Sequence, residues 1–264
     1  MKTRLNEMAI QRKYKELPNM GDYDTYEKAK YVFQKLITEI YMGSDNSNYE
    51  ELLVLELVKK YPELTNEMLF FYSDAILNTV PYLALRSNSG RVNCPRLIKK
   101  LAAKTDFNVP IVCSRMHGGG APIQFWMLKN LAGNRSSFLW DIILDYADLN
   151  ITYENRTLMD AVCESFTQLE GYNVFSNIKV YYKILSVLID KGVRYTLKYS
   201  PIYYLIDCAL GWFGNWKITK ACDEPSFVSL FELLDDYSNF RPIFPEQTSY
   251  NELYERLRNV IYGN

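Results

Sequence analysis

His117 is the single histidine of the chain, and three glycines follow it directly. A histidine can act as a general acid or base near neutral pH. A glycine-rich segment can turn its backbone amides toward an anion, above all beside a helix N-terminus. Residues 116–120 are therefore the first place in the sequence where catalytic or anion-binding chemistry has to be considered.

The string MHGGG at 116–120 resembles the oxyanion loop of lipases and esterases. That chemistry also needs a serine in a GxSxG elbow and a second, catalytic histidine, and the sequence contains neither. We therefore expect no hydrolase and predict no enzyme activity. Two other interpretations stay open: the glycines let a connector turn sharply into a helix that begins at Pro122, or their amides bind an anion or a partner carboxylate.

Metal and cofactor sites have no support in the sequence. The five cysteines are scattered and form no CxxC pair; they are Cys94, Cys113, Cys163, Cys208 and Cys222. Their odd number favours a reducing compartment over a disulfide framework. The nucleotide-binding patterns GxxxxGK[ST] and GxGxxG are both missing. We predict no metal and no cofactor.

The composition is that of a folded, helix-rich protein. Of 264 residues, 48% are hydrophobic and 23% charged, with a formal net charge of −1. No signal-peptide core and no apolar stretch of the roughly 20 residues that span a bilayer is visible. We expect no membrane association, a cytoplasmic location in the protein's own cell or a host cell, and no general attraction to nucleic acid.

An internal repeat is the main organising feature. Five amphipathic segments each end in a turn that carries one apolar residue: Leu64, Phe107, Leu149, Val193 and Phe240. These positions are separated by 42 to 47 residues. Such a period is typical of proteins built from stacked helical units.

A second set of helices is predicted between these turns. Apolar residues recur at spacings of three and four over 122–132, 157–168, 200–213 and 248–262, and we expect a further helix over 67–80. Several of these helices begin with Ser or Thr as a cap or with Pro in the first turn. The pattern therefore predicts pairs of helices joined by connectors.

Fragments from three of the repeating segments carry a family resemblance. YADLN at 146–150 followed by TLMDA at 157–161, together with LIDKGV at 188–193 and SPIY at 200–203, resembles the ankyrin repeat. The observed period exceeds the standard ankyrin length of about 33 residues and is closer to that of HEAT repeats, so a HEAT-like stack stays open. The resemblance implies a binding module, and free-standing divergent members of this kind are often viral or bacterial products that act on a host protein.

The predicted fold is an all-α solenoid of about five stacked antiparallel helix pairs, ankyrin-like, forming a single domain over 1–264. The predicted repeats cover 23–66, 67–109, 121–151, 157–196 and 200–242. Residues 1–22 and the helix at 248–264 are expected to cap the two ends, because terminal repeats expose a face that inner repeats bury.

With no catalytic set, binding is the expected activity: the protein would block, sequester or bridge a partner protein of unknown identity. In ankyrin-like stacks the connectors before the first helices project along one edge. The candidate partner-binding residues lie on three such connectors; they are Met116, His117, Tyr153, Asn155, Arg156, Tyr195, Lys198 and Tyr199.

A basic segment provides the alternative. Residues 86–115 contain seven Lys or Arg and a single acid, Asp106. A HEAT-like solenoid could use this segment to bind an acidic partner or nucleic acid. The ordinary structural explanation, a solvated helix face and loop, is also open.

Overall fold

The computed structural model describes residues 24–42, 48–72, 75–87, 94–113, 120–130, 137–166, 174–207, 224–237 and 248–263. The chain divides into two compact units, residues 1–119 and residues 120–264. Each unit is described by itself.

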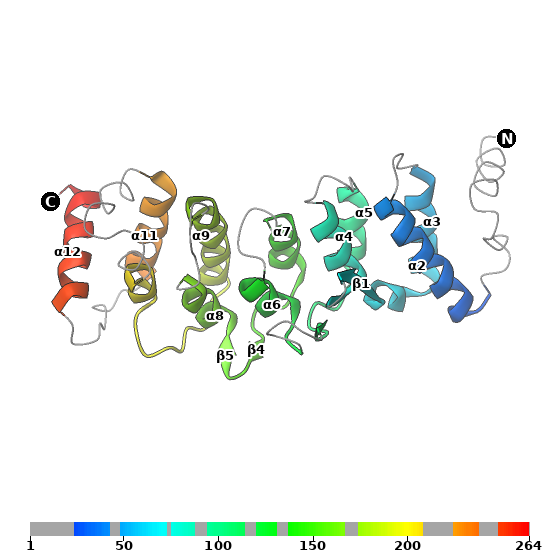
Figure 1. The fold of residues 1–264 in the computed structure, drawn as a ribbon, viewed down its shortest axis with the longest axis horizontal. Coiled ribbons are helices and arrows are strands. Elements are labelled where there is room, and N and C mark those ends of the chain that lie inside the picture. Colours follow the sequence, from blue (N-terminus) through cyan, green and yellow to red (C-terminus); the bar gives the residue numbers. More distant parts are fainter. Residues whose placement is uncertain are drawn as a thin grey trace. The chain divides into compact units, whose positions relative to one another are not determined.

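The first unit contains two helix pairs. The first pair is α2 (Tyr26–Met42) with α3 (Asn48–Lys60), and the second is α4 (Thr79–Ser87) with α5 (Pro95–Ala102). The partners of each pair contact one another, α2 also contacts α4, and α3 also contacts α5 (Figure 1). The first helix of one pair therefore packs on the first helix of the other, and the second helices pack on one another in the same way. A 3₁₀ turn, η2 (Pro62–Asn66), follows α3.

A small antiparallel sheet corrects one expectation: two of its strands lie between the helix pairs in sequence, and the third follows α5. The helix predicted over 67–80 is wrong: β1 (Met68–Tyr72) pairs with β2 (Ala75–Asn78), which pairs with β3 (Val112–Cys113). The aromatic run of β1 favours an extended strand over a helix. Pro81 also restricts a helix there to its first turn, since proline interrupts the helix interior, and α4 accordingly begins at Thr79.

The second unit is also built mainly from helices. It contains α6 (Ile123–Asn130), α7 (Ser137–Tyr146), α8 (Leu158–Ser165), α9 (Val174–Asp190), a helical segment at 201–207, α11 (Pro225–Tyr237) and α12 (Thr248–Tyr262). Helix α6 contacts α8, while α9 contacts α7 on one side and α11 on the other. The helix predicted over 248–262 is confirmed as α12.

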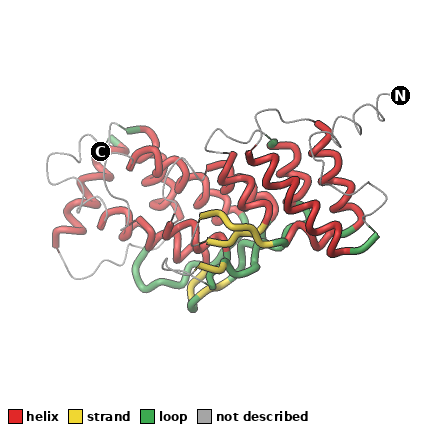
Figure 2. Tube along the Cα trace, turned by 45° about the vertical axis from the view of Figure 1, so that its right-hand side comes forward, coloured by secondary structure: helices red, strands yellow, loops and turns green. Residues whose placement is uncertain are grey.

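A hairpin of β4 (Thr152–Tyr153) and β5 (Arg156–Thr157) joins α7 to α8. Figure 1 shows it extending past the ends of α6 and α8, and Figure 2 draws the helices in red with the short strands in yellow. The next connector begins at Gly192, whose φ of 65° ends α9. The N–H of Val193 donates to the carbonyl of Leu188 across this turn at 2.9 Å, a Schellman-type helix end.

The apolar turn residues of the repeat are buried. Leu64 is 0% exposed, and Phe107, Leu149 and Val193 are each 3% exposed; Phe240 lies outside the described residues. Each of the four follows the second helix of a pair and inserts into the core below it. Burial of an apolar side chain after the second helix of each of these four helix pairs explains the regular spacing of the four residues.

Two of these turns share a polar detail as well. The N–H of Asn108 donates to Asp106 Oδ1 and the N–H of Asn150 donates to Asp148 Oδ1, both at 2.9 Å. An aspartate that binds the amide two residues later stabilises a turn locally. The sequence Asp-apolar-Asn thus produces the same turn after α5 and after α7.

The predominantly helical architecture is confirmed, and the predicted repeats each contain two described helices or helical segments. No helix in the described ranges is long and apolar enough to cross a membrane. The N-terminal capping segment, residues 1–22, lies outside the described residues. The single continuous domain and the ankyrin type of the repeat stay predictions.

Candidate functional site

The tip of the β4–β5 hairpin is a tight two-residue turn. Glu154 and Asn155 occupy it with φ angles of 52° and 61°, which is the left-handed pair of conformations that matches the twist of a hairpin. Asn tolerates this conformation better than most residues. Asn155 and Arg156 are exposed, whereas the ring of Tyr153 packs against Phe125 of α6 with centroids 5.5 Å apart.

Asp160 fixes the start of α8 directly behind the hairpin. Its N–H donates to Thr157 Oγ1 at 3.1 Å, and the N–H of Thr157 donates to Asp160 Oδ2 at 3.0 Å. This reciprocal arrangement is a capping box, which satisfies two amides that a helix start leaves unpaired. Because Thr157 also ends β5, the cap orients the hairpin relative to the helix.

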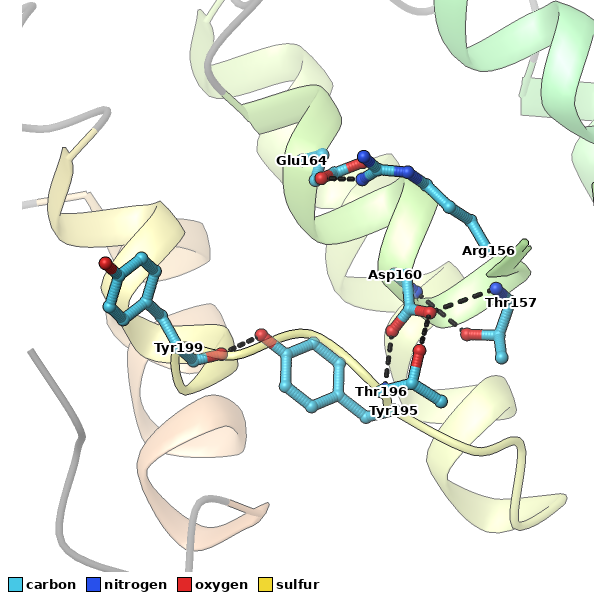
Figure 3. Close-up of polar contacts among 7 residues, drawn as sticks. All are labelled: Arg156, Thr157, Asp160, Glu164, Tyr195, Thr196 and Tyr199. Atoms are coloured by element: carbon cyan, nitrogen blue, oxygen red, sulfur yellow. Dashed lines mark hydrogen bonds and ion pairs between the residues drawn. The ribbon is translucent and has the colours of Figure 1, made fainter. Parts of the chain in front are cut away.

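The same carboxylate holds the next connector. The N–H of Thr196 donates to Asp160 Oδ1 at 2.7 Å, and Thr196 Oγ1 donates to Oδ2 at 2.6 Å (Figure 3). Asp160 is 0% exposed, so a lost partner would leave its buried carboxylate less well satisfied. One buried side chain therefore ties together two connectors that are 36 residues apart in sequence.

The connector after α9 is braced a second time. The hydroxyl of Tyr195 donates to the backbone carbonyl of Tyr199 (Figure 3). Burial raises the pKa of Tyr195 well above its usual range, so this hydroxyl stays a donor at any physiological pH. The ring of Tyr199 packs on that of Tyr203 at 4.7 Å, and Lys198 Nζ lies 5.2 Å from the centre of the Tyr199 ring.

Arg156 leaves the hairpin and runs along the surface of α8, where its guanidinium pairs with Glu164 (Figure 3). The two side chains are 44% and 33% exposed. An ion pair this exposed contributes little to stability. It orients the arginine while leaving much of its surface open to a partner.

The structure brings six of the eight predicted residues to one edge of the second unit. We call this the connector edge: Tyr153, Asn155, Arg156, Tyr195, Lys198 and Tyr199. The other two, Met116 and His117, lie outside the described residues. Within the edge, Tyr195 serves mainly as an internal brace, and Asn155, Arg156 and Lys198 are the exposed members.

The residue that sequence reasoning missed is Asp160. The signal was present, because Thr followed three residues later by an acid is a helix-start pattern. Its second role was hidden, since nothing in the sequence indicates that Thr196 reaches back to the same carboxylate. That contact depends on how neighbouring helix pairs stack.

Reactive groups are scarce in the described part of the chain. No group of three or more His, Cys, Asp or Glu that could hold a metal occurs there. Cys94 and Cys163 are buried and not disulfide-bonded. Burial raises the pKa of Cys94 to about 12 and also raises that of Cys163, so both thiols stay protonated at pH 7.

Comparison of the chain with protein-family models, with curated proteins and with solved structures found no match.

Proposed function

We propose that this protein is a non-catalytic interaction module, an ankyrin-like stack of helix pairs that binds a partner protein and thereby blocks, sequesters or bridges it. Its connector edge is the proposed binding surface. The hairpins between helix pairs favour an ankyrin-like unit, which combines a β-turn with two helices, over a HEAT-like unit of helices alone. The ankyrin resemblance further suggests a viral or bacterial effector that acts on a host protein.

The observation that carries the proposal is the double attachment of Asp160. It holds the β4–β5 hairpin and the connector at 191–199 in fixed positions through hydrogen bonds of 2.6 to 3.1 Å. A surface that is ordered before binding loses less conformational entropy when the partner arrives. A buried network that orders exposed loops is the arrangement expected of a preorganised binding edge.

The side chains on the edge suit a protein partner. An exposed arginine, a lysine over an aromatic ring and an asparagine at a turn tip combine rigid contact area with adaptable hydrogen bonding. The arginine is the strongest candidate for a hot spot, because it is both exposed and already oriented by Glu164.

A cytoplasmic site of action belongs to the same proposal. The two described free cysteines are buried and protonated, as is usual for structural thiols in a reducing compartment.

The test begins with affinity capture from the native cell or host, followed by purification of the dominant bound protein. The dissociation constant of that protein is then measured for the wild type and for Arg156→Ala and Lys198→Ala. Each variant should weaken binding by about 1 to 2 kcal/mol, roughly 5- to 30-fold, if its side chain is a hot spot. Thermal stability should change little, because an exposed pair and an exposed lysine contribute little to folding.

Lys179→Ala is the matched control, since Lys179 is an exposed cation on α9 of the same unit. Tyr195 is replaced by Phe rather than Ala, because its ring and hydroxyl brace the connector from within. Normal binding by both Arg156→Ala and Lys198→Ala would rule out the connector edge as the binding surface.

A further inference from the structure

Helix α5 carries an exposed row of cations in the first unit. We call it the α5 basic face: Arg96, Lys99, Lys100 and, just past the helix end, Lys104. The opposite side of the helix is buried in the core. Along the helix axis the four positions span about 12 Å, at a rise of 1.5 Å per residue.

These four side chains have no acidic partner in the described part of the chain. No hydrogen bond or ion pair there involves any of them. Glu51 on the neighbouring helix α3 is near enough to contribute, after burial, to the raised pKa of Cys94 at the start of α5. It nevertheless forms no ion pair with Arg96.

The arrangement is unfavourable for the helix itself. Arg96 lies three residues before Lys99 and four before Lys100, so like charges face one another on the surface of α5, and Lys104 adds a further cation just past the helix end. The helix dipole favours Lys99 and Lys100 near the C-terminus, but it disfavours a cation in the first turn, where Arg96 lies. The first turn contains no acid, and Cys94 supplies no side-chain cap.

Helix α3 shows the usual arrangement by contrast. Glu56 precedes Lys60 by four residues, the spacing and order that stabilise a helix surface. Helix α3 packs beside α5. The last turn of α3 contains two lysines, Lys59 and Lys60, which the helix dipole favours at that end. Among the described residues, α3 thus places an acid at the spacing that favours one of its lysines, whereas α5 contains no acid at all.

We propose that the α5 basic face is a docking site for a short acidic segment of a partner protein, a stretch of chain with several Asp or Glu carboxylates. Charge complementarity carries the choice: four cations in a row, with no acidic partner among the described residues, match carboxylates spaced along an extended peptide. A nucleic acid fits less well. The chain has a net charge of −1, α5 has no aromatic ring on which a base could stack, and a 12 Å row is short for a long polyanion.

This site is in the first unit and shares no residue with the connector edge of the second unit. Each surface is therefore changed by its own variants, and failure of either proposal is visible independently of the other.

The experiment measures binding of a fluorescently labelled ten-residue glutamate peptide to the full chain by anisotropy, at 50 and 200 mM NaCl. A ten-residue glutamine peptide and a ten-nucleotide thymidine oligomer serve as the neutral and nucleic-acid probes. The wild type should bind the glutamate peptide, more weakly at the higher salt concentration because ions screen exposed charges. The glutamine peptide should not bind.

The decisive comparison is between two triple variants with the same net charge. Arg96→Gln, Lys99→Gln and Lys100→Gln together should weaken binding of the glutamate peptide at least tenfold. Lys179→Gln, Arg194→Gln and Arg256→Gln, three exposed cations of the second unit, should change it less than twofold. Equal losses in both variants, no binding by the wild type, or tighter binding of the thymidine oligomer through α5 would each overturn the proposal.

The melting temperature of Arg96→Gln distinguishes a binding role of Arg96 from a purely structural one, because the two roles predict changes of opposite sign. Arg96→Gln removes a cation from the positive end of the helix dipole, so its Tm should stay the same or rise. A fall in Tm would mean that Arg96 supports the helix itself, and it would contradict a binding role for this residue.

Discussion

At the residue scale, one buried carboxylate organises the candidate site. Asp160 accepts hydrogen bonds from Thr157 and from both donors of Thr196 while it is completely shielded from water. Its position in the core would look unfavourable for a charged group considered alone. The surrounding donors reverse that expectation, and the exposed residues Asn155 and Arg156 are held in place as a result.

Asp160→Ala should therefore destabilise the protein by about 2 to 4 kcal/mol. The variant removes a carboxylate that accepts one hydrogen bond from Thr157 and two from Thr196, and a hydrogen bond to a charged group commonly contributes about 1.5 to 3 kcal/mol. Chemical denaturation measures the change. Asp148→Ala is the control, because that exposed residue accepts only the Asn150 amide bond in its turn, and it should cost less than about 1 kcal/mol. Similar losses in the two variants would contradict the role assigned to Asp160.

At the element scale, Glu67 joins α2 to the segment before β1. It accepts hydrogen bonds from Tyr26 at 2.7 Å and Gln34 at 3.3 Å, and it pairs with Lys30 at 3.0 Å. Burial, and then the bond to this carboxylate, raises the pKa of Tyr26 to about 12. Asp235 has a comparable role under α12, where it accepts from Tyr254 and Tyr262.

The raised pKa makes these junctions sensitive to alkali. A tyrosine ionises near pH 10 in the unfolded chain, whereas Tyr26 ionises near 12 in the folded protein. The unfolded state therefore loses its proton first, and the stability that Tyr26 contributes is complete below pH 10 and is lost as the pH rises toward 12. Denaturation midpoints at pH 9, 10 and 11 should fall less steeply for Tyr26→Phe than for the wild type.

Tyr31→Phe provides the comparison, since Tyr31 is on the same helix and is 51% exposed. Its pH profile should follow that of the wild type. A Tyr26→Phe profile that coincides with both would contradict the proposed coupling between Tyr26 ionisation and the α2 junction.

The elements also show what could be predicted from the sequence and what could not. Periodic apolar spacing located α12 because its buried positions, Leu253 and Leu257, recur at helical intervals. The same reasoning failed over 67–80, where a short apolar run is compatible with either a helix or a strand. In the structure this run forms a hairpin whose second strand, β2, also pairs with β3, more than thirty residues away. Such a long-range contact is not visible in a local pattern. The attachment of Thr196 to Asp160 escaped prediction for the same physical reason, because it is a long-range contact.

At the scale of the whole molecule, a buried apolar residue after each second helix recurs in both compact units. Leu64 and Phe107 lie in the first unit, and Leu149 and Val193 in the second. Their regular separation is explained by one requirement, that each helix pair must bury its turn against its own core. The two units also differ in what their described residues expose: the first exposes a row of cations on α5, and the second exposes the connector edge with its mixed chemistry.

Binding of a protein at the connector edge is tested most directly by hydrogen exchange of the purified complex. Partner binding should slow amide exchange at 152–157 and 194–199, above all at the exposed hairpin tip of Glu154 and Asn155, while α12 exchanges as in the free protein. A complex in which these two connectors exchange at their free rates, with protection confined to other parts of the chain, would contradict binding at this edge.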